Sequence, residues 1–384
     1  MGLIVKYPGT AILYTAVVLL CFILSSYPSK IRSANENNIR AKFQISAIIM
    51  ILTLLSGLRG SSVGLDTWGY IRIIEANGEW ATITDRGFVL LIKVTRVLLG
   101  KNPQIVLFLI AFLINFFIVK ALFDMGDICD FRFALFVYLT TFYFLTFSGI
   151  RQWLSVAIIS YAIKYIRKEK YVTYIIWVLI ASTFHLSALL GMLNVPLIIF
   201  FTKKDYLPKR TKKLHEFGIL LFPVVCVALG WVYANLVSKY SHWISEEYER
   251  VGEFGTMYIG LILLFVLICS YILFFKKQYA IEGQSIYFLL PIGIFALLTH
   301  IFAGIIGLYI RNIGRVEWCF SIGCCMLYAS FFGKSVFVSK GQIGAICKTG
   351  IKFLLILFCI YEFYYMLNNG GSGQVPYVLF GEFR

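Results

Sequence analysis

The chain has 384 residues, of which 60% are hydrophobic and 14% are charged, and its mean hydropathy is +0.82. A soluble chain has about a quarter of its residues charged, so this composition excludes an ordinary soluble protein. It predicts an all-α, polytopic bundle of transmembrane helices. The net charge of +16 does not indicate a nucleic-acid partner, because basic loops usually mark the cytoplasmic face of a membrane protein.

Apolar runs near the length of a membrane crossing, about 20 residues with a range of roughly 17–25, recur along the chain. About twelve crossings are predicted, at 7–27, 43–58, 103–123, 131–147, 150–166, 171–184, 186–201, 217–237, 257–275, 285–303, 316–333 and 351–367. The stretch 171–201 is long for one crossing and tight for two, and we divide it at His185 because the sides then agree with the charges. We expect one integral membrane domain, 1–384, with outer loops at 59–102, 238–256, 304–315 and 368–384.

Lysines and arginines assign a side to each loop. The loops placed inside hold 20 of the 35 basic residues, mostly lysines, and are 28–42, 124–132, 167–170, 203–213, 276–277 and 334–352. Arginines instead mark the ends of apolar segments on the other side: Arg59, Arg72, Arg86, Arg151, Arg311 and Arg315. Arginine near hydrocarbon is costly, and its planar fork suits phosphate oxygens. This cluster predicts a site for a phosphate-bearing lipid.

Segment 87–100 is apolar but carries Lys93 and Arg96. As a helix it reaches only about 21 Å, which predicts an amphipathic helix lying at the outer interface. The alternative, a thirteenth crossing, would place the basic loop 203–213 outside.

The outer loop LRGSSVGLDTWGY, residues 58–70, combines an arginine, three glycines, an aspartate and two aromatic residues. Glycines let a backbone approach a ligand closely. Trp68 and Tyr70 are candidates for stacking on sugars, and Asp66 is a candidate general base. The alternative is an ordinary interfacial loop with an aromatic anchor.

Two further strings carry candidate site residues. In SGIRQWLSVAII, residues 148–159, Arg151 and Gln152 begin a helix, whose N-terminus attracts anions such as a diphosphate. The alternative is an arginine that snorkels to the interface. In ASTFHLSALL, residues 181–190, His185 is a proton shuttle or phosphate donor, or else a hydrogen-bonded packing residue.

The last strings lie near the C-terminus. In YIRNIGRVEW, residues 309–318, Arg311 and Arg315 are four apart and share one face of a helix. The segment QVPYVLFGEFR, residues 374–384, returns outside and brings Tyr377 with it. No metal or cofactor is expected, and three aspartates in an inner loop, Asp124, Asp127 and Asp130, are read as solvated charges.

Together, four patterns resemble the EpsG-like branch of the Wzy-type bacterial polymerases of O-antigen, exopolysaccharide and capsule. They are R-G-x-x-x-G-x-D-T-x-x-Y at 59–70, S-G-I-R-Q-x-L-x-x-A at 148–157, A-S-x-F-H-x-S-A at 181–188 and V-P-Y at 375–377. One departure is V-G-L-D, where the pattern often has a threonine before the aspartate. The resemblance implies a GT-C-like glycosyltransferase of the bacterial cytoplasmic membrane, which joins undecaprenyl-diphosphate-linked oligosaccharides at the periplasmic or exterior face.

The roles that follow are expectations. Arg151, with Asp66 or His185 as the base, would be catalytic, while Arg59, Arg311 and Arg315 would help to bind the two diphosphates. Gln152, Trp68, Tyr70 and Tyr377 would bind substrate. Membrane lipids are expected partners, and a chain-length regulator protein is left open. So are two other functions: a lipid-linked oligosaccharide flippase, which needs basic residues deep in several helices, and an O-antigen ligase, which usually has a larger outer loop than 59–102.

Overall fold

The structure is a computed structural model that describes residues 6–31, 38–79, 85–202, 292–293, 318–332, 342–370 and 373–381. Within these ranges the chain is helical, as predicted, and contains no strand, only an isolated antiparallel β-bridge between Arg59 and Leu379. The chain divides into two compact units, of which the first comprises Met1–Met192 with Leu357–Arg384 and the second Leu193–Ile356. The predicted single domain stays a prediction.

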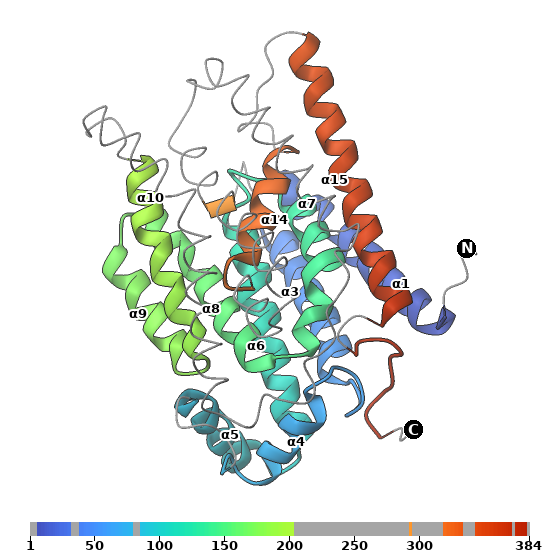
Figure 1. Ribbon diagram of the computed structural model, residues 1–384, viewed down its shortest axis with the longest axis vertical. Coiled ribbons are helices and arrows are strands. Elements are labelled where there is room, and N and C mark those ends of the chain that lie inside the picture. Colours follow the sequence, from blue (N-terminus) through green and yellow to red (C-terminus); the bar gives the residue numbers. More distant parts are fainter. Residues whose placement is uncertain are drawn as a thin grey trace, which may run out of the picture. The chain divides into compact units, whose positions relative to one another are not determined.

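The helices follow in chain order (Figure 1). They are α1 (Pro8–Leu24), α2 (Ser26–Ile31), α3 (Ile39–Gly57), α4 (Thr67–Glu75), α5 (Arg86–Leu99), α6 (Pro103–Asp124), α7 (Phe131–Val137), the π-helix η1 (Tyr138–Phe142), the 3₁₀ helix η2 (Tyr143–Phe147), α8 (Ile150–Arg167), α9 (Tyr171–Ser182), the 3₁₀ helix η3 (Leu186–Leu193), α10 (Asn194–Thr202), α14 (Ser321–Ser330) and α15 (Gln342–Asn369). The predicted break at His185 is confirmed, because α9 ends before it and η3 begins after it.

Four described stretches are long and apolar enough to cross a membrane: Pro8–Lys30, Ile39–Gly57, Pro103–Asp124 and Gln342–Asn369. They match the predicted crossings 7–27, 43–58, 103–123 and 351–367. The total of about twelve stays a prediction, because the crossings 217–237 and 257–275 lie outside the described residues, as does 285–303 apart from residues 292–293. Arg311 and Arg315 also lie outside the described residues.

Within the inner segment predicted at 334–352, α15 already begins at Gln342, so the helix is longer than the predicted crossing 351–367. The side on which this segment lies stays a prediction. A helix satisfies its own backbone hydrogen bonds, so it continues beyond the hydrocarbon layer without needing further apolar residues.

The core of the first unit is formed by α6, which packs against α3 and α8, while α8 packs against α9. Helix α8 presents small buried residues, among them Ser155, Ala157 and Ser160. Small side chains let helix backbones approach closely. This packing fixes α8 beside α6, and with it the position of Arg151 in the first turn of α8.

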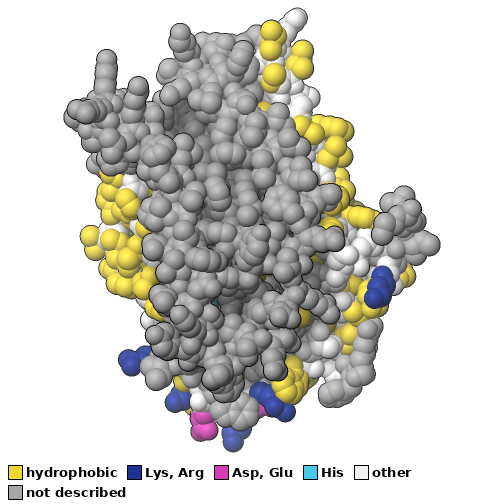
Figure 2. All heavy atoms as spheres, viewed as in Figure 1, with side chains coloured by type: hydrophobic (Ala, Val, Ile, Leu, Met, Phe, Trp, Pro, Cys, Tyr) yellow, Lys and Arg dark blue, Asp and Glu magenta, His cyan; other side chains and the backbone are white. Residues whose placement is uncertain are grey.

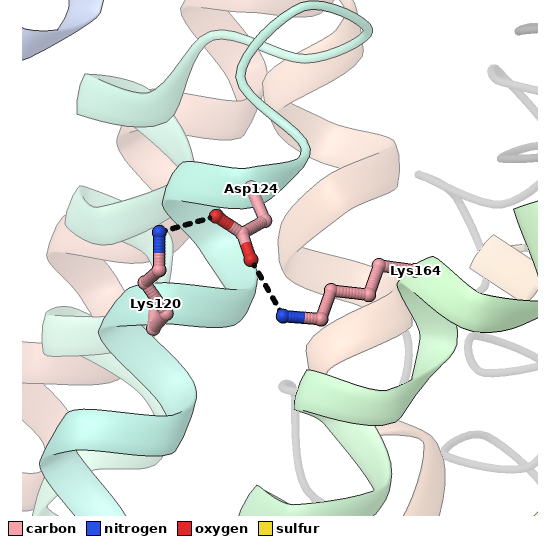
Figure 3. A network of polar contacts seen from close by, with 3 residues as sticks. All are labelled: Lys120, Asp124 and Lys164. Atoms are coloured by element: carbon pink, nitrogen blue, oxygen red, sulfur yellow. Dashed lines mark hydrogen bonds and ion pairs between the residues drawn. The ribbon is translucent and has the colours of Figure 1, made fainter. Parts of the chain in front are cut away.

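The opposite end of the first unit is fixed by ion pairs. Asp124 of α6 accepts from Lys120 at 2.7 Å and from Lys164 of α8 at 3.1 Å (Figure 3). Asp127 pairs with Arg167, and Asp130 accepts from a backbone N–H in the first turn of α7. The prediction of solvated charges is wrong for Asp124, whose side chain is 15% exposed and binds two lysines, and for Asp130, which caps α7. Asp127 is exposed, as that prediction expects.

Helix α5 exists as predicted and has two apolar faces. Phe88 and Ile92 are buried, whereas Val97 and Leu98 are 83% and 73% exposed. Figure 2 shows most of the visible charged side chains gathered at the lower end, where Figure 1 places α4 and α5, and apolar side chains along the flanks. An exposed apolar face beside charged residues is typical of a helix that lies on a membrane surface.

We expect a fluorophore at Val97→Cys to be quenched by brominated lipid and protected from an aqueous quencher. The comparison is Lys101→Cys, an exposed position just after the helix, in a background where the exposed Cys347 is replaced by serine. Equal aqueous quenching at both positions would show that α5 stands in water.

Candidate functional site

The segments that carry the four sequence patterns meet at one end of the first unit, which we call the motif end (residues 58–75, 85–88, 147–152, 183–187 and 373–381). The backbone N–H of Gly64 donates to the carbonyl of Gly373 at 2.7 Å, and that of Gly87 donates to Thr183 at 2.9 Å. The N–H of Gly149 donates to the Asp66 carboxylate at 3.1 Å. Residues more than 300 positions apart in the sequence thus form one surface.

Glycines make these close approaches possible. Gly64 has a φ of +90°, and a Cβ there would collide with the carbonyl oxygen of Phe147. Gly149, with a φ of +62°, is the N-cap of α8. Both conformations favour glycine, because a side chain in the left-handed region is strained. The glycines of loop 58–70 were expected to let a ligand approach the backbone. At Gly64, however, the close neighbour is the backbone of Phe147.

Asp66 lies at the N-terminus of α8 as well as at the start of α4. One of its carboxylate oxygens, Oδ2, accepts from Gly149, the N-cap residue of α8. A carboxylate at this position is stabilised by the helix dipole. Its other oxygen has no hydrogen-bond partner among the described residues, so it remains an acceptor for a substrate hydroxyl.

Arg151 is held above two aromatic rings by one carboxylate. Its Nη1 donates to Oδ2 of Asp85, and the exposed fractions of the two side chains are 22% and 3%. The guanidinium carbon lies 5.5 Å from the centre of the Tyr70 ring and 5.8 Å from that of Phe88. Its Nε is buried and has no hydrogen-bond partner in the described part of the chain. The guanidinium is therefore oriented and still has donor capacity for an anion.

The sequence did not single out Asp85. It lies 66 positions before Arg151 and directly precedes α5 as its N-cap residue. The only local signal is an acidic residue at a predicted helix start, which is common at helix N-termini. Its pairing with Arg151 depends on the position of α5, which the hydrogen bond from the Gly87 N–H to the Thr183 carbonyl holds beside the end of α9.

Arg59 is buried, with an exposed fraction of 2%. Its Nη2 donates to the carbonyl of Phe147 at 3.2 Å, its Nη1 donates to the carbonyl of Ser56, and its Nε contacts the Thr67 hydroxyl at 3.4 Å. Burial lowers the pKa of Arg59 to about 10, so the side chain is still a cation at neutral pH. These contacts join the end of α3 to η2 and α4. Diphosphate binding by Arg59 stays a prediction.

Trp68 and Tyr377 differ in exposure. Trp68 is 56% exposed, and the guanidinium of Arg72 lies 3.8 Å from the centre of its ring. Tyr377 donates its hydroxyl to the carbonyl of Leu55 at 2.9 Å, and its N–H donates to the Thr10 hydroxyl at 2.9 Å. Burial raises the pKa of Tyr377 to about 12. Trp68 is thus available to a sugar, whereas Tyr377 fastens the C-terminal segment to α1 and α3.

His185 lies in the turn after α9. Its Nδ1 is 2.7 Å from the Ser187 hydroxyl and accepts from the Ser187 N–H at 3.3 Å. A ring nitrogen that accepts leaves the proton on Nε2, which suits donation to an oxygen better than removal of a proton. Gln152, by contrast, is only 4% exposed. At the motif end the guanidinium of Arg151 lies over the Tyr70 ring, and Asp66 accepts from Gly149 at the start of the helix that carries Arg151.

A family model described as the EpsG family matches residues 42–379, which is most of the chain. The protein belongs to the EpsG family. The range matched by the EpsG family contains all the patterns that meet at the motif end, together with Asp85. No curated protein and no solved structure matches the chain. Membership of the EpsG family, with the apolar helices, is consistent with a polymerase of polysaccharide in a membrane.

Proposed function

We propose that this protein is a glycosyltransferase that joins undecaprenyl-diphosphate-linked oligosaccharide repeat units at the outer face of the bacterial cytoplasmic membrane. Family membership supports a polymerase of this general kind. The observation that carries the proposal is the convergence of Asp66, Tyr70 and Arg151, from two distant segments, at the same end of the helices. A base, an aromatic surface and an oriented cation are the groups that transfer from a lipid diphosphate requires.

In the proposed reaction, the bond between the donor sugar and its diphosphate breaks, and the diphosphate leaves with the electron pair. The acceptor hydroxyl of a second lipid-linked unit forms the new glycosidic bond and loses its proton. Negative charge develops on the leaving diphosphate in the transition state. A preoriented guanidinium at Arg151 stabilises that charge more strongly than it stabilises the ground state.

Asp66 is assigned as the general base that removes the proton of the acceptor hydroxyl. Its unpartnered oxygen is free to accept from a hydroxyl, whereas Nδ1 of His185 already accepts from Ser187. We therefore assign His185 a donor role toward a phosphate or sugar oxygen. Trp68 is assigned to the glycan because its ring is exposed, and aromatic faces pack well against the apolar faces of sugars. Arg59 and Tyr377 are assigned the role of positioning the loops of the site, because their side chains donate to backbone carbonyls of the chain itself.

The test is a reaction of purified protein in liposomes with one synthetic undecaprenyl-diphosphate-linked repeat unit. We expect a ladder of longer lipid-linked glycans without any nucleotide sugar. Movement of the unlengthened unit across the bilayer, with no ladder, would favour the flippase instead. Transfer to added lipid A in place of self-transfer would favour the ligase. Either result would overturn the polymerase assignment.

A further inference from the structure

A polar cavity lies at the end of the first unit that is opposite to the motif end. Its volume is about 330 Å³, and it opens between α2 and the start of α3. The polar residues that line it are Ser26, Tyr27, Lys30, Arg40 and Gln44. Among these described residues two are cations and none is an acid, which favours an anion. We call it the α2–α3 groove.

Arg40 is oriented within this groove by its neighbours. Its guanidinium carbon lies 4.5 Å from the centre of the Tyr27 ring. Asn38 donates to the Tyr27 hydroxyl at 3.3 Å, and the same side chain accepts from the N–H of Ala41 in the first turn of α3. The helix cap therefore fixes the ring, and the ring supports the guanidinium. No described residue forms a hydrogen bond or ion pair with Arg40, unlike Arg167, which pairs with Asp127.

A second observation points to a ligand with a hydroxyl group. Gln44 follows Arg40 by one helical turn and lines the same groove, and its side-chain oxygen is buried without a hydrogen-bond partner among the described residues. A buried acceptor without a donor is unfavourable, because it has lost its hydrogen bonds to water. A ligand that brings both an anionic oxygen for Arg40 and a hydroxyl for Gln44 satisfies both side chains.

The position of the groove indicates that the ligand is a lipid. It lies at the ends of two candidate membrane crossings, Pro8–Lys30 and Ile39–Gly57. Apolar side chains near it point outward, with exposed fractions of 61% for Ile23 and 72% for Phe43. Phosphates of membrane lipids lie at the ends of crossings, and basic pockets between helices bind anionic headgroups.

We propose that the α2–α3 groove binds an anionic phospholipid whose phosphodiester carries a hydroxyl-bearing headgroup, of the phosphatidylglycerol type. The phosphate accepts from Arg40 and Lys30, and a headgroup hydroxyl donates to Gln44. The acyl chains lie along the exposed apolar residues of α1 and α3. The site is separate from the proposed diphosphate site, so it does not depend on the polymerase assignment.

The experiment measures lipid retention by native mass spectrometry, after the intact protein is extracted from vesicles of phosphatidylglycerol and phosphatidylcholine in equal amounts. We expect Arg40→Ala to retain about tenfold less phosphatidylglycerol, since a charge-assisted hydrogen bond to phosphate is lost. Arg40→Lys keeps the charge and loses the planar fork, so its retention is expected to be intermediate. In a second set of vesicles, with phosphatidic acid in place of phosphatidylcholine, Gln44→Leu is expected to narrow the preference for phosphatidylglycerol over phosphatidic acid, which lacks the headgroup hydroxyls.

The matched control is Lys168→Ala, which removes an exposed cation at the same end of the unit and outside the groove. It is expected to retain the lipid as the wild type does. Wild-type retention by both Arg40 variants, or equal loss in the control, would overturn the proposal. Displacement of the lipid by free glycerol phosphate would show a site for a soluble anion and would also overturn it. If Arg40→Ala fails to fold, the result with Arg40→Lys decides.

Discussion

Replacing Arg151 with alanine is expected to lower the rate of glycan transfer by about 10²–10³-fold, the loss typical when one donor to a developing anion is removed. The guanidinium lies over Tyr70 and Phe88 with a buried Nε that has no partner among the described residues. The ladder assay with a lipid-linked repeat unit measures the loss. The effect should fall on the rate constant at saturating substrate, because the donor acts mainly on the leaving group.

Two further variants separate this chemistry from a loss of structure. Arg151→Ala removes the cation that pairs with Asp85, whose side chain is 3% exposed, so the fold itself is at risk. Arg151→Lys retains a partner for Asp85 but lacks the planar fork, and we expect a folded protein that is still slow. Lys101→Ala removes an exposed cation at the start of α6 and should be fully active. Wild-type activity in Arg151→Ala would exclude the assignment.

Replacing Arg59 is expected to destabilise the protein rather than only to slow it. Its side chain is among the largest that are fully buried, and it donates to the carbonyls of Ser56 and Phe147. Arg59→Ala removes the donor to the Ser56 carbonyl, leaves the Phe147 carbonyl with only the Thr67 hydroxyl as a side-chain donor, and opens a cavity, at a cost of about 2–5 kcal/mol. Thermal unfolding in detergent, followed by circular dichroism, measures the effect.

The volume and the hydrogen bonds of Arg59 can be separated. Arg59→Met fills most of the space but donates nothing, so we expect it to be less stable than the wild type and more stable than Arg59→Ala. Lys101→Ala again provides the control. If Arg59→Ala unfolds at the wild-type temperature yet makes no ladder, the residue binds substrate directly and the positioning role is excluded.

The sequence predicted which segments lie at the same end of the protein, because successive membrane crossings place their loops on alternate sides. A helix that crosses must return, so charges in the loops assign alternate ends. Loop 59–70, the start of α8 and the C-terminal segment were all placed on one side, and the hydrogen bonds of Gly64 and Gly149 bring them together. Which of the two ends faces the cytoplasm stays a prediction.

The sequence did not predict how individual side chains are oriented. Arg59 follows one apolar helix and Arg151 lies at the start of another, so the sequence gives no reason to distinguish them. One is buried against backbone carbonyls, while the other lies partly exposed over two rings. That difference arises from the fold of α4 and α5, which bring Thr67 to one arginine and Asp85 to the other. The Asp85 contact spans 66 residues and the Phe147 contact of Arg59 spans 88, and contacts so distant in the sequence leave no local pattern.

The most direct test is a structure of the protein in a lipid nanodisc with a non-reacting undecaprenyl-diphosphate-linked repeat unit. We predict that diphosphate oxygens lie within hydrogen-bond distance of the Arg151 guanidinium, with an acceptor hydroxyl facing Asp66. A diphosphate bound at the opposite end, beside Lys120 and Lys164, or one that makes no contact with Arg151, would contradict this assignment of the site.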